Sequence, residues 1–167
     1  MRIRLLAVGR RMPAWVDTAY NDYARRLPHE CRLDLTEIAP GNRKGKGKGK
    51  GKGKGKNNTA DRAIADEDRR ICDSLDGDLD VIALSVDGKP WATEQLAAHM
   101  REWMADGRDR ALLVGGPEGL GPNSLARANR RWSLSPLTLP HPLVRVILAE
   151  QLFRAHSILT GHPYHRG

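Results

Sequence analysis

Residues 110–122, "RALLVGGPEGLGP", join a short apolar run to a segment dense in glycine and proline. The stretch from Arg110 to Gly116 is typical of a buried strand, because its central residues are consecutively apolar and a glycine pair closes it. The segment that follows is too rich in glycine and proline for regular structure. A glycine loop with a carboxylate, here Glu118, directly after a strand has the sequence pattern of a cofactor loop.

This loop does not match the common phosphate-binding motifs. Its glycine spacing differs from the dinucleotide fingerprint, and prolines stand where the following helix should begin. No Lys-Ser or Lys-Thr pair follows, so it is not a Walker loop either. The residues alone leave two interpretations open, a tight structural turn or a loop whose backbone closely approaches a ligand.

Strands and helices are expected to alternate along the rest of the chain. The expected strands are 3–9, 32–38, 80–86 and 132–139, and the expected helices are 13–27, 59–75, 93–107, 123–131 and 143–160. The last of these strands contains Pro136, which favours an irregular or edge position. The alternation predicts the α/β class with a largely parallel sheet. The length predicts a single domain over 1–167.

The net charge of the chain comes from one segment. Lysine and arginine number 28 against 20 acidic residues, a formal charge of +8, and eight of the cations lie between Arg43 and Lys56. The rest of the chain is therefore neutral. A strict Gly-Lys repeat has no apolar surface to bury, so we expect 43–57 to be a disordered low-complexity insertion. It is either an expanded repeat in a tolerant loop or an arm that attracts phosphates.

The cysteines and the N-terminal residues indicate the compartment. Cys31 and Cys72 lie in unlike contexts and form no metal-ligand spacing, so we expect reduced thiols, no metal and a cytoplasmic protein. The first apolar run is too short for a signal peptide, and no segment approaches the length of a membrane span.

Two further segments carry residues suited to ligand binding. In "LSPLTLPHPLVR", residues 134–145, prolines flank His141 and polar side chains interrupt an apolar strand, which leaves backbone groups free to bond a ligand. A proline-kinked entry to the last helix is the alternative. The tail "TGHPYHRG", residues 160–167, gathers an aromatic ring, imidazoles and a guanidinium that could stack a base and bond a phosphate. Its alternative is a frayed polar chain end.

Several long motifs, in one order, resemble a known family. They are "GGPEG" from Gly115, "LSPLTLPHPLVRVILAEQLFRA" from Leu134 and "HPYHR" from His162, together with "VGRRMPAWV" and "DGKPW". The chain is thereby similar to the RlmH family of SPOUT-class methyltransferases over almost its whole length. The resemblance implies an α/β fold with a C-terminal trefoil knot, a homodimer, and transfer of a methyl group from S-adenosylmethionine to ring nitrogen N3 of a pseudouridine in 23S ribosomal RNA of the ribosome.

The resemblance also implies a set of site residues. The cofactor contacts that it assigns are Leu84, Gly115, Gly116, Leu134, Ser135, Pro136, Leu137, Thr138 and Leu139. The tail is expected to complete the target site across the dimer. The residues expected to act on the target are His165, Arg154 and Tyr164 as catalytic groups, with His141 and Arg166 binding the substrate.

The reaction needs a base or a stabiliser of negative charge. The target nitrogen is a weak acid and must lose its proton as it attacks the methyl group, so an imidazole could accept the proton, or cationic side chains could stabilise the developing anion. The sequence leaves the base open between His165 and His141. The cofactor itself supplies the electrophile, so the chemistry calls for no metal.

Three other functions remain open at this point. A methyltransferase of the same class could act on transfer RNA, and a protein that kept the fold without the chemistry could simply bind ribosomes. A nucleic-acid chaperone could work through the Gly-Lys repeat alone, in which case a peptide of the repeat would bind RNA and changing Gly115 would have no effect.

The Gly-Lys repeat departs from the family pattern, in which the corresponding basic loop is shorter. We predict that deleting Lys46 to Lys54 weakens ribosome binding at low salt, because phosphate contacts release counterions and are strongly salt-dependent. Turnover at saturating ribosome should stay nearly intact. Ribosome titrations at two salt concentrations measure both quantities, and a fall in saturated turnover would contradict the prediction.

Overall fold

The computed structural model describes residues 1–43 and 55–165, and in these ranges the chain forms one parallel sheet. The strand order is β2-β1-β4-β3-β5, and every neighbouring pair is parallel. The bounds are β1 Ile3–Val8, β2 Leu33–Ile38, β3 Leu79–Pro90, β4 Asp109–Val114 and β5 Arg130–Ser133. The predicted α/β class with a parallel sheet is confirmed.

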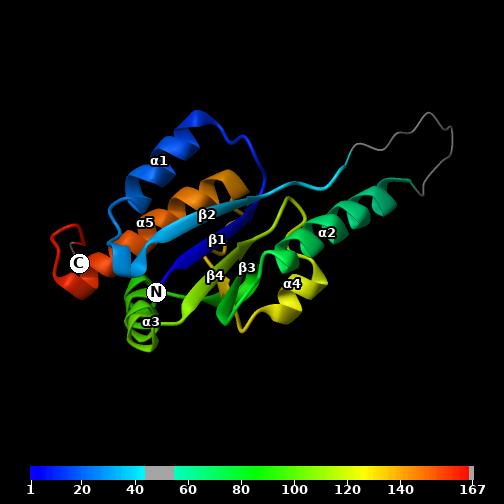
Figure 1. The fold of residues 1–167 in the computed structure, drawn as a ribbon. Coiled ribbons are helices and arrows are strands. Elements are labelled where there is room, and N and C mark those ends of the chain that lie inside the picture. Colours follow the sequence, from blue (N-terminus) through cyan, green and yellow to red (C-terminus); the bar gives the residue numbers. More distant parts are fainter. Residues whose placement is uncertain (44–54, 166–167) are drawn as a thin grey trace.

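Helices cover both faces of this sheet (Figure 1). Their bounds are α1 Ala14–Ala24, α2 Gly55–Asp73, α3 Thr93–Asp106, α4 Pro122–Arg127 and α5 His141–Thr160, with a short 3-10 turn at His29–Cys31. One core cluster joins α1, α3 and α5 to the sheet, and a second joins α2 to its other face. The molecule therefore has three layers, with α2 and α4 on the side opposite α1, α3 and α5.

The central strands β1 and β4 each end in four consecutive apolar residues, because both of their faces are covered there. Leu5 and Leu112 point into the cluster under α1, α3 and α5, whereas Leu6 and Leu113 point into the cluster under α2. All four side chains are fully buried. This double burial is the reason that an unbroken apolar run, rather than an alternating pattern, marks β1 and β4.

Two expected boundaries near the C-terminal half are wrong. The expected helix 123–131 ends at Arg127, because Asn129 exchanges two 2.8 Å hydrogen bonds with Val81 and thereby starts an edge strand instead. The expected strand 132–139 is the short β5, which stops at Ser133. Residues 134–140 are an irregular loop.

The third strand is longer than expected. It continues through Asp87–Pro90, beyond the expected end at residue 86, and Trp132 of β5 pairs with both Leu84 and Lys89 across a register shift. This irregularity takes up the residues between the two pairing positions, Ser85 to Gly88.

The structure describes only the edges of the expected insertion at 43–57. Arg43 forms ion pairs on one side, and α2 begins at Gly55 on the other, earlier than the start expected near Thr59. The remainder of the Gly-Lys repeat lies outside the described residues.

Within those same ranges, no helix combines the length and apolar character needed to cross a membrane. Cys31 and Cys72 are both free thiols, and burial raises the pKa of Cys31 to about 11.

Candidate active site

Two cavities lie near the two ends of helix α5, one of about 330 Å³ and one of about 930 Å³. The larger cavity lies at the carboxyl ends of β3, β4 and β5. Its walls are the end of β3, the loop after β4, the loop after β5 and the first turn of α5. Ligands of parallel α/β proteins bind at this end of the sheet. The two segments that the sequence left ambiguous, the glycine loop and the proline loop, are thus opposite walls of one cavity.

The cofactor contacts implied by the resemblance gather around this cavity. Those that line it are Leu84, Gly115, Gly116, Leu134, Ser135, Leu137, Thr138 and Leu139. Pro136 belongs to the same loop but is not among the lining residues. His141, expected to bind substrate, lies beside them at the start of α5.

The glycine loop is a tight turn and a cavity wall at once. The amide of Gly119 donates to the carbonyl of Gly116 at 2.9 Å, and the two residues form an isolated antiparallel bridge. A Cβ on Gly115 would lie 2.3 Å from the carbonyl carbon and oxygen of Gly119. The interpretation as a tight turn is therefore confirmed, and position 115 has no room for any side chain. The close approach of this backbone to a ligand stays a prediction.

The proline loop opposite is held by its own serines. Ser133 donates its hydroxyl hydrogen to the carbonyl of Ser135 at 3.2 Å, and the Ser135 hydroxyl accepts a 2.9 Å hydrogen bond from the amide of Leu137. Because this loop joins no ladder of the sheet, it can turn backbone groups toward a ligand.

Two carboxylates lie at this cavity. Hydrogen bonding from Ser85 lowers the pKa of Asp87, and the Arg43 guanidinium lowers the pKa of Glu118. Both groups line the cavity and are ionised near neutral pH. Apolar walls with a negative border suit a ligand that carries both an apolar ring and a positive charge.

His141 is the imidazole at this cavity. Burial, followed by the positive charges of Arg145 and Arg43, lowers its pKa, and Glu67 opposes the shift. The ring is therefore neutral near pH 7 and able to accept a proton. Arg145, one turn further along α5, is buried and donates to Glu37 and to the carbonyl of Gly9, both at 2.8 Å.

The tail residues form a second cluster, at the other end of α5. Arg154 pairs with Glu150 at 2.5 Å and lies 4.9 Å from the centre of the Tyr164 ring. The Tyr164 hydroxyl donates to Glu150 at 3.1 Å and lies 3.4 Å from the hydroxyl of Tyr23. Burial and these two neighbours raise the pKa of Tyr164. His165 lies 3.9 Å from Glu94, and Arg166 lies outside the described residues.

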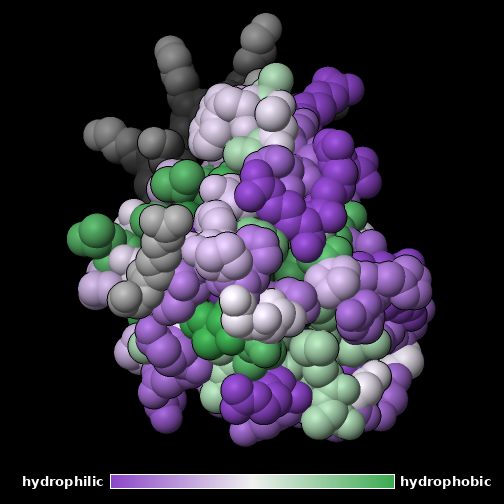
Figure 2. Space-filling view, turned by 90° about the vertical axis from the view of Figure 1, so that its left-hand side faces the viewer, coloured by the Kyte–Doolittle hydropathy of each residue, from purple (hydrophilic) through white to green (hydrophobic). Residues whose placement is uncertain are grey.

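One chain does not bring the two clusters together. His141 begins α5 and Arg154 lies 13 residues later, which at 1.5 Å per residue separates them by about 20 Å. Neither Tyr164 nor His165 lines the large cavity. The face that carries the C-terminal end is largely hydrophilic, with hydrophobic side chains in small patches (Figure 2).

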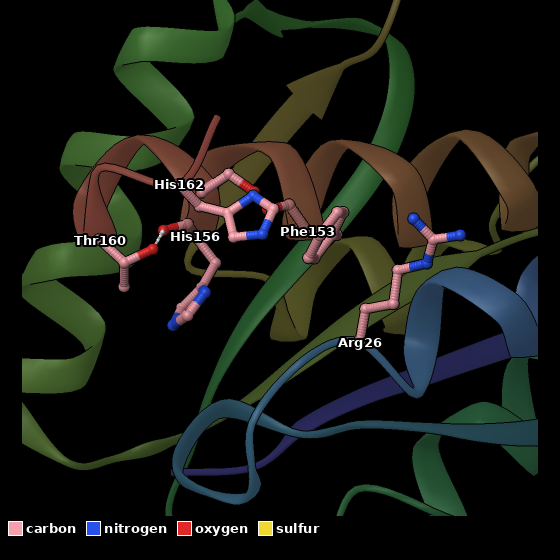
Figure 3. Close-up of a pocket in the computed structure, with 6 residues that line it drawn as sticks. Arg26, Phe153, His156, Thr160 and His162 are labelled. Atoms are coloured by element: carbon pink, nitrogen blue, oxygen red, sulfur yellow. Dashed lines mark hydrogen bonds between the residues drawn. The ribbon is translucent and has the colours of Figure 1, made fainter. Parts of the chain in front are cut away.

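A smaller cavity, of about 330 Å³, lies beside this tail. Its lining residues are Arg26, Phe153, His156, Ser157, Thr160 and His162. The Phe153 ring lies between His162 and Arg26 (Figure 3), and the Arg26 guanidinium stacks 5.6 Å from its centre. His162 and the tail cluster thus adjoin each other through Phe153.

Three buried charged residues escaped the sequence analysis. Helix α2 buries Glu67 and Asp68 together with the apolar side chains of Ala63 and Ile71. Arg145 was hidden in an apolar helical pattern. The adjacent carboxylates Glu67 and Asp68, four and three residues before the apolar Ile71, are the sequence signal that could have indicated buried charge on this helix. Within 1–43 and 55–165, no group of three or more potential ligands is placed to hold a metal ion.

Comparison with known proteins agrees with this geometry. The family model described as "Predicted SPOUT methyltransferase" matches residues 1–165, so the chain belongs to the SPOUT methyltransferase family. It is an enzyme of the methyl-transferring class, which takes the methyl group from a donor cofactor. The crystal structure of the "Probable Methyltransferase" from Bordetella pertussis Tohama I has the same fold, with a TM-score of 0.57 and 16% identity over 92% of this chain and 93% of that one.

Related sequences indicate which group of SPOUT methyltransferases the chain resembles most. The chain is 52% identical over 166 residues to the "Ribosomal RNA large subunit methyltransferase H" of Chromohalobacter salexigens, which covers 99% of this chain and 100% of that protein. It is 55% identical over 167 residues to the protein of the same name from Alkalilimnicola ehrlichii, with 99% of each chain covered. The resemblance to the RlmH family is confirmed.

The environment of His141 leads to a prediction. Its NMR titration midpoint should lie below about 6.5, the ordinary histidine value, because burial and two arginines disfavour the charged ring. Since the folded pKa is the lower one, the unfolded state binds more protons, and the free energy of unfolding should fall as pH drops below that ordinary value. His141→Gln assigns the resonance, and a midpoint at or above 6.5 would contradict the argument.

Proposed function

We propose that this protein transfers a methyl group from S-adenosylmethionine to N3 of a pseudouridine in 23S ribosomal RNA of the assembled ribosome. The observation that carries the proposal is the convergence of the glycine loop, the proline loop and His141 on one cavity. The relatives named ribosomal RNA large subunit methyltransferase H support the choice of substrate.

The residues present fit S-adenosylmethionine. This cofactor supplies a methyl group attached to a positively charged sulfur. Leu84, Trp132 and Leu139 offer apolar walls for its adenine ring, and Asp87 with Glu118 offers negative charge near its cationic groups. The glycine loop brings backbone to the cavity edge without a side chain at Gly115. The irregular proline loop supplies the amides and carbonyls that orient a nucleoside.

The chain's own residues manage the proton of the target base. N3 of pseudouridine carries a hydrogen that must leave as the nitrogen gains a methyl group. His141, neutral and beside the cavity, accepts that proton in the simplest arrangement. His165 serves the same purpose if the tail of another chain enters the cavity, with Arg154 and Arg166 stabilising the developing anion.

The separation of the two clusters favours a homodimer. About 20 Å of α5 lies between His141 and Arg154, so Tyr164, His165 and Arg166 would reach a methyl donor in the partner's cavity. The trefoil knot implied by the family stays a prediction, and residues 134–160 are the segment that would thread it.

The setting follows from the substrate. An enzyme that acts on assembled ribosomes is cytoplasmic, and it meets RNA already folded against proteins. Such a substrate does not require a broad basic surface. The neutral charge of the chain outside the Gly-Lys repeat is consistent with this.

Transfer of a radiolabelled methyl group tests the proposal. Label from S-adenosylmethionine should enter 23S RNA at a pseudouridine when assembled ribosomes from cells without this protein are the substrate. Gly115→Ala should abolish cofactor binding in calorimetry and transfer together, because its Cβ overlaps the Gly119 backbone. Gly77→Asn is the control, because an added Cβ at Gly77 meets no atom within 4 Å and asparagine tolerates the positive φ of this residue. Label confined to transfer RNA would change the substrate, and cofactor binding without label anywhere would favour a binding role.

Mixing two inactive variants tests the composite site. Gly115→Ala should abolish cofactor binding in its own chain, and His165→Ala removes the imidazole that the tail would bring to the partner's cavity. If the tail acts on the partner, a heterodimer of the two keeps one complete site and should recover up to about half of the wild-type activity per dimer formed. Activity that stays at the level of the separate variants, despite heterodimer formation, would contradict a tail that acts across the dimer.

A further inference from the structure

Helix α2 buries two successive carboxylates against the cofactor loop. Glu67 is 2% exposed and Asp68 is 1% exposed. Buried carboxylates are costly unless charge or hydrogen bonds compensate them. The hydrogen-bond partners of Glu67 and Asp68 therefore show which part of the chain these carboxylates stabilise.

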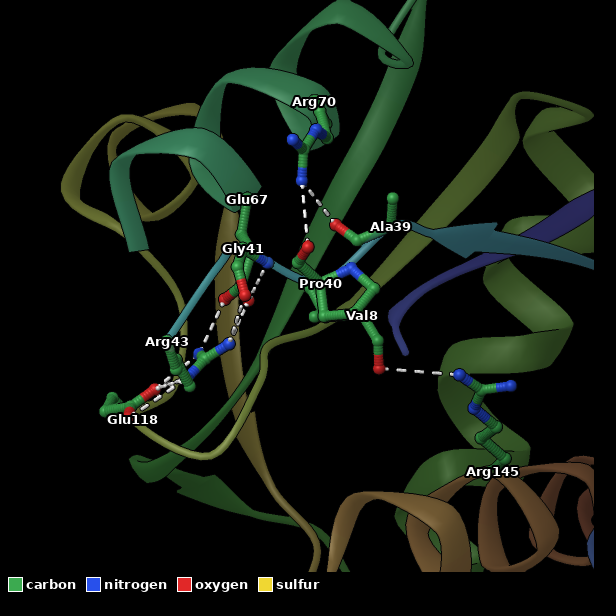
Figure 4. Close-up of polar contacts among 9 residues, drawn as sticks. All are labelled: Val8, Ala39, Pro40, Gly41, Arg43, Glu67, Arg70, Glu118 and Arg145. Atoms are coloured by element: carbon green, nitrogen blue, oxygen red, sulfur yellow. Dashed lines mark hydrogen bonds and ion pairs between the residues drawn. The ribbon is translucent and has the colours of Figure 1, made fainter. Parts of the chain in front are cut away.

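Glu67 acts through Arg43. Its carboxylate accepts hydrogen bonds from the Gly41 amide at 2.7 Å and from the Arg43 guanidinium at 2.6 and 3.1 Å. The same guanidinium pairs with Glu118 of the glycine loop at 2.5 Å. Figure 4 shows Arg43 lying between the two carboxylates. Hydrogen bonds from Arg43 to Glu67 and then to Glu118 raise its pKa, so the bridge stays charged at every physiological pH.

The helix also touches the backbone at this end of the loop. A Cβ on Gly116 would lie 2.9 Å from a Glu67 carboxylate oxygen and 3.0 Å from the Arg43 guanidinium. Glycine at this position therefore lets the ion pair pack directly on the loop.

Asp68 holds the other end of the loop. It accepts hydrogen bonds from the amide of Ser124 at 2.7 Å, the hydroxyl of Ser124 at 2.5 Å and the amide of Asn123 at 3.0 Å. Burial opposes its ionisation, but these hydrogen bonds outweigh burial and lower its pKa. A Cβ on Gly121 would lie 2.4 Å from the Asp68 carboxyl carbon.

The loop is thus clamped at both ends by neighbouring residues of one helix. We propose that Glu67 and Asp68 are positioning residues for the methyl donor, because together they fix the glycine loop 116–121 that forms one wall of the cavity. Glu67 sets the start of this wall through Arg43 and Glu118, and Asp68 sets its end through Ser124. The proposal rests on the proposed cofactor site, but the clamp itself can be measured without any ligand.

The clamp is separable from the packing that holds α2 in place. Ile71 and Leu75, at the end of the helix and just after it, fix this region to the sheet through apolar contacts with the strands. Glu67→Gln and Asp68→Asn keep the volume of each side chain and remove its charge. They should therefore loosen the loop while the three-layer fold remains. Asp66→Asn and Asp73→Asn, on less buried sites of the same helix, are matched controls.

The experiment combines amide hydrogen exchange with calorimetry. In the ligand-free protein, Glu67→Gln and Asp68→Asn should speed exchange in peptides covering 115–124 and leave β1 and β4 unchanged. The Kd for S-adenosylmethionine should rise about tenfold, which corresponds to the loss of one buried charged hydrogen bond. KM for the cofactor should rise more than kcat falls, and the two control variants should match the wild type.

A double-mutant cycle excludes a purely structural effect. Glu67→Gln and Glu118→Gln cut the same bridge from opposite sides of Arg43, so their effects on Kd should be far from additive. Additive effects, an unchanged Kd in a folded variant, or faster exchange spread over the whole sheet would overturn the proposal. If the wild type itself fails to bind S-adenosylmethionine, the proposed function fails, and loop exchange still decides whether the clamp exists.

Discussion

The candidate site depends on close packing in the loop after β4. There the backbone packs against itself and against two carboxylates of α2. Gly115 lies against Gly119, Gly116 against Glu67 and Gly121 against Asp68, each at a distance that excludes a Cβ. These contacts hold the loop against its neighbours, and in this position it forms a wall of the large cavity. The sheet supplies the position of this wall, and α2 supplies its rigidity.

Helix α5 gives the molecule a second organising feature. Its first turn brings His141 to the cavity and buries Arg145 against the ends of β1 and β2. Its last turns carry Arg154 and pack against the tail. A single helix therefore carries His141 near one end and Arg154 near the other, about 20 Å apart, too far to contact one small ligand in one chain. That separation is the physical reason for proposing a site built by two chains. In such a site the glycine loop comes from one chain and the tail from the other.

The sequence predicted the layers better than the site. Apolar runs marked β1 and β4, and the helix expected over 93–107 is α3 nearly to the residue, since these signals are local. The early end of α4 and the start of β5 depend on Asn129 bonding to Val81, a contact between distant residues. The charged clamp was missed because carboxylates on a helix ordinarily face water, and only the folded loop reveals their partners. Cofactor residues came from the family motifs, and the cavity then placed all but Pro136 of them at its wall.

In the proposed function the methyl donor lies between the glycine loop and the proline loop. Ultraviolet cross-linking of radiolabelled S-adenosylmethionine, followed by peptide mapping, tests this directly in the wild-type protein. Label is expected in peptides that cover 112–121 and 134–141, with competition by unlabelled cofactor. Competable label confined to peptides around Phe153 and His162, which line the smaller cavity, would contradict it.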